Sequence, residues 1–183
     1  ILPGTMLQGK TKVGKNCTLG PDTQLTDVIC GDGNHLNRVY AHSCELGDNN
    51  EIGPFVHLRP ETCLHNDIKI GNFVEVKNSD VDDGTKLPHL IYCGDSDLGK
   101  NVNFGCGTVT VNFDGKNKHR CTIDEHAFIG CNTNLVAPVH IGARAFTAAG
   151  STITKDVPAK ALAVGRAKQV NIENWVKEDT YKD

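Results

Sequence analysis

The feature that most constrains the fold is an aliphatic side chain that recurs every six residues. Three sets of positions carry this repeat: Leu7, Val13, Leu19 and Leu25; Leu46, Ile52, Leu58, Leu64, Ile70 and Val76; and Ile123, Ile129, Leu135 and Ile141, continuing through Thr147 to Ile153. A period of six does not fit an α-helix, whose turn takes 3.6 residues. It fits a short strand followed by a bend, because a small residue, often Gly, follows many of the aliphatic positions. Three such faces make a triangular coil, and stacked coils form a parallel β-helix.

Composition and charge exclude several classes of partner. The chain has 183 residues, of which 38% are hydrophobic and 22% charged, as is typical of a soluble protein with one core. The net charge of -3 provides no strong field for nucleic acid, so we expect no nucleic-acid partner. No apolar run approaches the roughly 20 residues of a membrane span. The first residues, ILPGTMLQGK, lack the pattern of a signal peptide.

The eight cysteines favour a reducing compartment. No two of them form a Cys-x-x-Cys pair, which argues against a zinc ribbon or a thioredoxin-like redox pair. An even count is compatible with a disulfide framework, but a chain of this length does not need one. We therefore expect reduced thiols that act as small core residues, in a cytoplasmic protein.

The six-residue period breaks in two places. The stretch VNFDGKNKHRCT, at about residues 111–122, has a turn signal at Asp114-Gly115 followed by five polar residues, so we expect a loop extruded from a coil, either functional or simply a solvated tip. The period ends at Pro158, which gives a β-helix over residues 1–158 and a C-terminal tail over 159–183. The only Trp, Trp175, lies between Ile172 and Val176 and suggests that this tail docks on a neighbouring surface.

Two cations are spaced as vertical neighbours. Arg59 and Lys77 are separated by three six-residue units, which make one full coil. Stacked in this way they would hold a phosphate or a carboxylate. The alternative is a solvated basic patch with no ligand.

His89, in the segment KLPHLIYCGD, is the best candidate for a general base. A neutral imidazole near pH 7 can accept a proton from an amine. It follows Lys77 by two six-residue units, so we expect it in the same region as that lysine. A lone His is more often a structural hydrogen-bonding group, but Tyr92, Asp95 and Asn103 nearby favour a role in a site.

The histidines do not favour a catalytic metal. A zinc site between coils would need three converging imidazoles, including a close pair on one coil. No His-x4-His pair exists, and the pairs His35/His42 and His119/His126 are seven residues apart. A phosphate-binding P-loop is also absent, because no Gly-Lys-Ser/Thr follows the segment GCGTVTVN. We expect no metal site.

Several segments together resemble one family. They are GPFVHLRPET, IGNFVEVKNS, KLPHLIYCGD, LGKNVNFGCGTVTVNFDGKNKHRCTI, IGCNTNLVAPVHIG, AAGSTITKDVP and NIENWV. In this order they resemble the C-terminal acetyltransferase domain of the bacterial bifunctional N-acetylglucosamine-1-phosphate uridyltransferase/glucosamine-1-phosphate N-acetyltransferase. The resemblance is close over about residues 53–176 and looser before them.

The resemblance implies a fold, an assembly and a reaction. The fold is a left-handed parallel β-helix, against the usual right-handed crossover preference. The assembly is a homotrimer with active sites between subunits, and the tail reaches a neighbouring subunit through Trp175. The reaction is transfer of acetyl from acetyl-CoA to the amine of glucosamine 1-phosphate, a step towards UDP-N-acetylglucosamine and the cell wall. No uridyltransferase domain lies in this chain.

The resemblance also implies roles for individual residues. His89 is the catalytic base, and Glu75 orients it or tunes its pKa. Arg59 and Lys77 clamp the sugar phosphate. Further contacts to the sugar come from Tyr92, Asn103 and Lys118. The acetyl-CoA side comprises Cys106, Asn112, Phe113, Cys131, Ala149 and Arg166, the last of these meeting a phosphate of CoA. Attack on the thioester is direct, so no cysteine forms an acyl-enzyme.

The chain departs from the family pattern at three positions on the acetyl-CoA side. Phe113 stands in place of a Tyr, Cys106 in place of an Ala, and Cys131 in place of a Ser. These changes leave two other functions to weigh. One is an acyltransferase of the same architecture acting on another amino sugar or small acceptor. The other is a degenerate, non-enzymatic trimeric scaffold.

Overall fold

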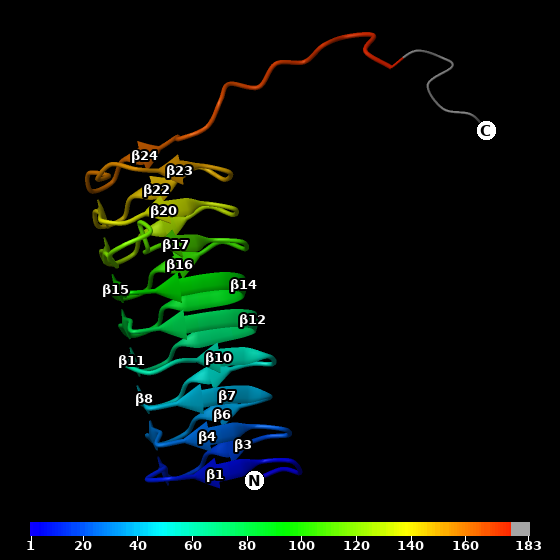
Figure 1. Cartoon of the computed structure of the whole chain (residues 1–183), viewed down its shortest axis with the longest axis vertical. Coiled ribbons are helices and arrows are strands. Elements are labelled where there is room, and N and C mark those ends of the chain that lie inside the picture. Colours follow the sequence, from blue (N-terminus) through cyan, green and yellow to red (C-terminus); the bar gives the residue numbers. More distant parts are fainter. Residues whose placement is uncertain (177–183) are drawn as a thin grey trace, which may run out of the picture.

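The computed structural model describes residues 1–176 and shows a single column of stacked coils (Figure 1). These residues contain 24 short β-strands and no helix. All paired strands run parallel, each strand joining the equivalent strand of the next coil. The parallel β-helix expected from the six-residue repeat is confirmed.

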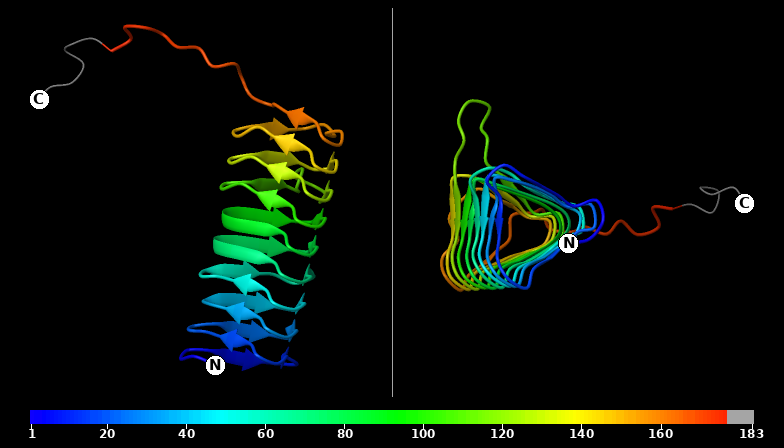
Figure 2. Two further views of the ribbon diagram at one scale, coloured as in Figure 1. Left: turned by 180° about the vertical axis from the view of Figure 1, so that it is seen from behind. Right: turned by 90° about the horizontal axis from the view of Figure 1, so that it is seen from below.

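The coil is a triangle in cross-section, as the view along the axis shows (Figure 2). Face 1 contains β1 (Met6–Gln8), β4 (Gln24–Thr26), β7 (Val39–His42), β10 (Val56–Leu58), β17 (Val109–Val111), β20 (Asn134–Val136) and β23 (Thr152–Ile153). Face 2 contains β2 (Lys12–Val13), β5 (Ile29–Cys30), β8 (Cys44–Leu46), β11 (Thr62–Leu64), β13 (Asp80–Val81), β15 (Ser96–Leu98), β18 (Cys121–Ile123) and β21 (Val139–Ile141). Face 3 contains β3 (Thr18–Leu19), β6 (His35–Leu36), β9 (Glu51–Ile52), β16 (Asn103–Phe104), β19 (Phe128–Ile129), β22 (Phe146–Thr147) and β24 (Leu162–Ala163). Two longer strands, β12 (Lys69–Lys77) and β14 (Lys86–Gly94), continue from face 3 onto face 1.

The aliphatic repeat forms the core of the column. Leu58 pairs with Val76 one coil above, and both side chains are buried. Further repeat positions that are buried are Leu19, Leu25, Leu46, Ile52, Leu64, Ile70, Ile123, Ile129, Leu135, Ile141 and Ile153. Leu7, in the first coil that the structure describes, is 42% exposed. Burial between coils is the dominant stabilising term for such a fold.

The bend from face 3 to face 1 has left-handed backbone in coil after coil. Arg38, Phe55, Phe73 and Leu90 occupy the same place in successive coils, with φ values of 48°, 60°, 59° and 55°. Positive φ is unfavourable for large side chains and marks a position worth a functional explanation. Three of these side chains are apolar and more than half exposed, and the rings of Phe55 and Phe73 stack at 5.4 Å. We call this bend the 3/1 corner.

One coil is longer than the others. Face 1 positions recur after about three six-residue units in most coils, as for Gln24 and Tyr40 or Val56 and Val74. The coil that follows Val109 is longer, because Val109 pairs with Asn134 and more than four six-residue units separate the two. The extra residues form a hairpin that protrudes where face 1 meets face 2 (Figure 2). The extruded loop is therefore confirmed, and its hairpin is closed by a bridge between Phe113 and Lys118.

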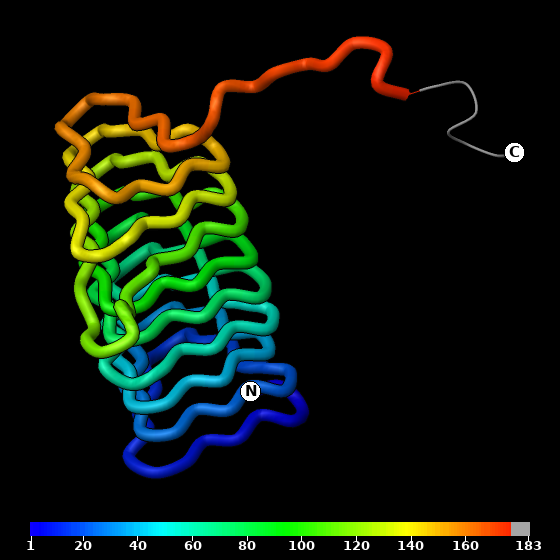
Figure 3. Tube along the Cα trace, turned by 45° about the horizontal axis from the view of Figure 1, so that its top comes forward, coloured from blue at the N-terminus to red at the C-terminus, as the bar shows by residue number. Residues whose placement is uncertain are grey.

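The chain leaves the column after β24, and residues 177–183 of the tail expected over 159–183 lie outside the described residues. Coils stack along one axis up to β24, and the tail then runs outward, away from the faces of its own chain (Figure 3). Trp175 is 76% exposed at its described end. All eight cysteines are free thiols. Within residues 1–176 no helix is long and apolar enough to cross a membrane.

Candidate active site

A charged cluster lies where face 1 meets face 2. It comprises Arg59, Glu75, Lys77, Asp95 and Lys118. Arg59 and Lys77 are confirmed as vertical neighbours, since the register pairs Leu58 with Val76 immediately before them. Arg59 donates from Nη1 to Oε1 of Glu75 at 2.9 Å, and Lys77 Nζ lies 3.6 Å from Oδ1 of Asp95.

Asp95 organises this cluster from a buried position. It is 3% exposed and accepts hydrogen bonds from the side-chain amides of Asn78 and Asn112. Burial by itself raises the pKa of Asp95, but these two hydrogen bonds and the charges of Lys77 and Lys118 outweigh it, so the pKa is lowered. Asp95 is thus held as a carboxylate that fixes Lys77 in place.

The protruding hairpin brings Lys118 to the cluster. Its side-chain nitrogen lies close enough to that of Lys77 that hydrogen bonding between the two groups, followed by the charge of Lys77, lowers the pKa of Lys118. The hairpin is ordered by Asp114, which accepts from the backbone N–H of Lys116 at 2.8 Å and pairs with His119 at 2.8 Å. Two ammonium groups and one guanidinium therefore converge on one corner, an arrangement that favours a dianion such as a phosphate monoester.

Arg120 ties the base of the hairpin to the column. It donates to the backbone carbonyls of Asn78 at 3.0 Å and Ser96 at 3.2 Å, and forms an ion pair with Asp97. The loop is thus an anchored element, and its position over the cluster does not depend on Lys118 alone.

His89 lies at the 3/1 corner, at the other end of face 1. It is exposed, and it pairs in register with Asn72 in the coil below. Gly94 is the register partner of Lys77, and His89 lies on the other side of the bend at Leu90. The four strand residues from Leu90 to Gly94 alone span about 13 Å. The expected proximity of His89 and Lys77 is therefore not found within one chain, because two six-residue units carry the chain across two faces of a three-faced coil.

The four residues expected on the acetyl-CoA side above His89 stand in a single column. The registers that flank the 3/1 corner place Cys106 above His89, Cys131 above Cys106, and Ala149 above Cys131. Backbone bonds hold the steps together, as when Asn132 N–H donates to the Cys106 carbonyl at 2.7 Å and Gly150 N–H to the Cys131 carbonyl at 2.8 Å. A Cβ atom added to Gly150 would lie 3.8 Å from Cδ of Arg166. Arg166 is therefore next to Gly150, and it completes this vertical row of residues above Ala149. We call His89, Cys106, Cys131, Ala149 and Arg166 the corner column.

The other expected residues divide between the two regions. Tyr92 and Asn112 join the charged cluster, because Asn112 Nδ2 donates to Tyr92 Oη at 3.3 Å as well as to Asp95. Glu75 pairs with Arg59 and lies below Tyr92 in register, three positions along the strand from Asn72. Phe113 is 54% exposed in the hairpin, beside Lys118. Asn103 lies on face 3, in the coil of Cys106 and three residues before it.

Face 1 between the two regions is hollowed. An open groove of about 820 Å³ runs across several coils, and its lining includes Tyr40, Phe55, Phe73, Glu75, Leu90 and Tyr92. The groove is bounded by Arg38, whose guanidinium lies 5.8 Å from the centroid of the Phe55 ring. This mainly apolar groove thus reaches Glu75 and Tyr92 at the charged cluster, and Leu90, the neighbour of His89 at the 3/1 corner.

The fold defines a class before any relative is considered: a hexapeptide-repeat parallel β-solenoid. No family model matches the chain. The polysialic acid O-acetyltransferase OatWY superposes with a TM-score of 0.53 at 14% identity, over 93% of this chain and 95% of that one. The UDP-N-acetylglucosamine acyltransferase of Francisella novicida gives 0.53 at 15% identity, over 90% and 64%. At such identities the likeness shows the fold alone.

Sequence comparison gives the family. The chain is 52% identical over 176 residues to the bifunctional protein GlmU of Geobacillus sp. (strain WCH70), and 55% identical over 178 residues to that of Caldanaerobacter subterraneus. These matches cover 96% and 97% of the chain. The chain belongs to the GlmU family and corresponds to its C-terminal part. It spans 38% and 39% of the length of these two relatives.

In the sequence, Asp95 stands out only as a neighbour of His89, at the Gly-Asp turn that ends KLPHLIYCGD, and no role of its own is predicted for it. A left-handed φ of 49° at this turn accompanies the contacts of its carboxylate with Lys77 of the coil below and with Asn112.

Proposed function

We propose that the chain transfers acetyl from acetyl-CoA to the amine of glucosamine 1-phosphate. The observation that carries the proposal is the convergence of Arg59, Lys77 and Lys118 at one end of face 1, in a chain half identical to GlmU. A phosphate monoester supplies the dianion that such a cluster binds. Arg59 would clamp two phosphate oxygens with its planar guanidinium, and the two lysines would add point charges.

His89 supplies the base in this proposal. The amine of an amino sugar is largely protonated near pH 7 and must lose a proton before it can attack. Once that proton has gone to solvent, the free amine attacks, and an exposed imidazole can take a second proton from the nitrogen as it bonds to the acetyl carbon. The carbonyl oxygen then carries the negative charge of a tetrahedral intermediate, which backbone N–H groups near Cys106 would stabilise. Collapse expels the CoA thiolate, which takes the proton from His89 and leaves as the free thiol, so no acyl-enzyme forms.

The corner column would hold acetyl-CoA. A cofactor lying along it has its thioester beside His89 and Cys106 and its phosphates towards Arg166, which would pair with one of them. The transfer needs no metal in this scheme. Eight free thiols support a cytoplasmic location, because cytosolic thiols stay reduced.

Two neighbouring chains would complete one site. In glucosamine 1-phosphate the amine and the phosphate sit on adjacent carbons. A ligand of this size cannot reach along face 1 from the 3/1 corner, where His89 lies, to the Lys77 position of the same chain, because the strand from Leu90 to Gly94 alone spans about 13 Å. A cyclic homotrimer that packs through the groove on face 1 would bring His89 of one copy to Arg59 and Lys77 of the next. It would also cover the exposed rings of Phe55 and Phe73, and it offers the outward-running tail, with Trp175, a neighbouring surface.

The test is release of free CoA thiol from acetyl-CoA in the presence of glucosamine 1-phosphate. We expect release that depends on this amino sugar and far less with glucosamine or with an amino sugar phosphorylated at another carbon. Equal rates with another acceptor would favour an acyltransferase of different specificity. No release at saturating substrates, with no binding of millimolar acetyl-CoA by calorimetry, would favour the scaffold.

A further inference from the structure

A second set of side chains with metal-binding chemistry lies on face 2, away from the groove. Cys63 is on β11, His65 directly follows that strand, and Asp80 is on β13 in the coil above. The register pairs Cys63 with Asp80, and His65 N–H bonds to the Val81 carbonyl, which places Asp82 above His65. Because alternate residues of a strand share a face, these four side chains form a square on the outside of the column.

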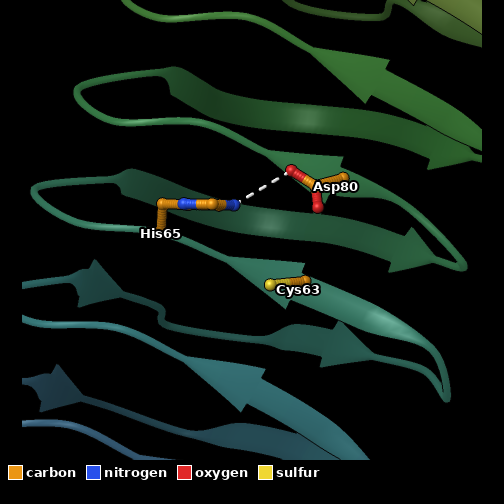
Figure 4. A group of neighbouring side chains, drawn as sticks. All are labelled: Cys63, His65 and Asp80. Atoms are coloured by element: carbon orange, nitrogen blue, oxygen red, sulfur yellow. Dashed lines mark hydrogen bonds and ion pairs between the residues drawn. The ribbon is translucent and has the colours of Figure 1, made fainter.

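The donor atoms in this square are already close together. His65 Nε2 lies 3.1 Å from Oδ1 of Asp80, and Figure 4 shows the imidazole pointing towards that carboxylate with Cys63 below it. One donor atom from each of Cys63, His65 and Asp80 lies within 4.8 Å of the other two. On the far side of the ring, His65 Nδ1 lies 4.0 Å from Oδ1 of Asp82.

The donor set identifies the ion that would fit. A thiolate, an imidazole and a carboxylate are the three side-chain groups that zinc binds, at about 2.0 to 2.3 Å. Closing the three donors around one ion needs side-chain rotations that shift them by about an ångström. Asp82 would accept from Nδ1–H and fix the tautomer that leaves Nε2 for the metal, an arrangement found at many zinc sites.

We propose that Cys63, His65 and Asp80 form a zinc site, with Asp82 as the partner that orients His65. The fourth position is open, since His65 and Asp80 have side chains 43% and 54% exposed, and water or Glu45 could fill it; Glu45 pairs with Cys63 from the coil below. The ion would link two adjacent coils on face 2. One of its ligands, Asp80, closely follows Lys77 along the chain. This proposal departs from the expectation of no metal site, which had considered only converging imidazoles.

A simpler interpretation is that His65 and Asp80 form an exposed hydrogen-bonded pair and nothing more. It predicts that removing the thiol of Cys63 has no effect on metal binding. The two interpretations therefore differ at Cys63, where a metal bond leaves a spectroscopic signature.

Cobalt titration of the metal-free protein distinguishes them. We expect one Co²⁺ per chain with a sulfur-to-cobalt charge-transfer absorption, displaced by one equivalent of Zn²⁺. Cys63→Ser should abolish the absorption, Asp80→Asn should weaken Zn²⁺ binding by more than tenfold, and Asp82→Asn by about tenfold to a hundredfold. Matched controls are Cys131→Ser, an exposed thiol elsewhere, and Asp97→Asn, one coil above Asp80 and paired with Arg120. Both should bind as the wild type does.

Three results would overturn the proposal. They are no charge-transfer absorption in the wild type, an absorption that survives Cys63→Ser, or equal losses in Asp80→Asn and Asp97→Asn. Thermal unfolding of each variant without metal checks that the fold is intact. Zn²⁺ should raise the melting temperature of the wild type and of both controls, and should not raise that of Cys63→Ser.

Discussion

The two ends of face 1 are built in different ways. The charged cluster is a network of side chains, in which buried Asp95 holds Lys77, Asn78 and Asn112 while a hairpin adds Lys118. The corner column is held together by backbone hydrogen bonds between successive coils, and each coil contributes one side chain at the same bend. The cluster is therefore held in place by its own contacts, whereas the corner column is an exposed run of backbone beside an imidazole. Under the proposed function, the cluster would bind the anion and the corner column would carry the chemistry.

The largest expected effect is on the chemistry at the column. His89→Ala should lower the turnover of thiol release by about 10² to 10⁴-fold, the usual contribution of a general base, with little change in KM for the sugar phosphate. His126→Ala, an exposed histidine at another corner, is the control and should keep full activity. Normal turnover with a raised KM in His89→Ala would mean that His89 binds the sugar phosphate and does not act as the base. The division between a binding end and a catalytic end would then be wrong.

Mixing subunits tests whether the two ends meet between chains. The His89→Ala protein and the Lys77→Ala protein should each be nearly inactive. If they are unfolded and refolded together, one interface in four combines an intact His89 with an intact Lys77, so about a quarter of the wild-type activity should return. Mixtures that are not refolded together serve as the control. Activity that never returns would place both residues of a working site in the same chain.

Asp95 should matter for stability as well as for binding. Asp95→Asn removes the charge that holds Lys77, and we expect a loss of about 2 kcal/mol in the free energy of unfolding at pH 7. The pKa of Asp95 is lowered in the folded state, so its stabilising effect is present above the unfolded pKa of about 3.9 and is lost as the pH falls through the folded value. The gap between wild type and variant should therefore close in acid.

Urea unfolding at pH 7 and at decreasing pH measures this gap. The matched control is Glu51→Gln, which breaks the exposed pair with Lys69, whose side chains are 65% and 63% exposed. It should cost less than about 1 kcal/mol at any pH. Equal losses for the two variants would mean that Asp95 is no more than a surface charge.

The comparison also shows what the sequence could predict. The six-residue repeat was sufficient for the faces, the core and the vertical pairing of Arg59 with Lys77, because each depends only on local spacing. It could not place His89 relative to Lys77, since the number of residues per face decides which corner a residue occupies. It could not assign Asn112 to Asp95 either, because that contact depends on the path of the hairpin after β17. Cys63 and His65 did not stand out, since their carboxylate partners come from the next coil.

The smallest expected effect concerns Cys131 in the column. A thiol is a weak hydrogen-bond donor, and Cys131 is exposed at a position where the resemblance leads us to expect a Ser. Cys131→Ser would offer acetyl-CoA a better donor at that position. A hydrogen bond of this kind contributes about 0.5 to 1.5 kcal/mol, so KM for acetyl-CoA should fall by about two- to tenfold while turnover stays unchanged. Cys17→Ser, in one of the first coils of the β-helix, is the control and should leave KM unchanged. An unchanged KM would mean that acetyl-CoA does not contact Cys131. The bound cofactor would then have to lie away from the 3/1 corner between Cys106 and Ala149.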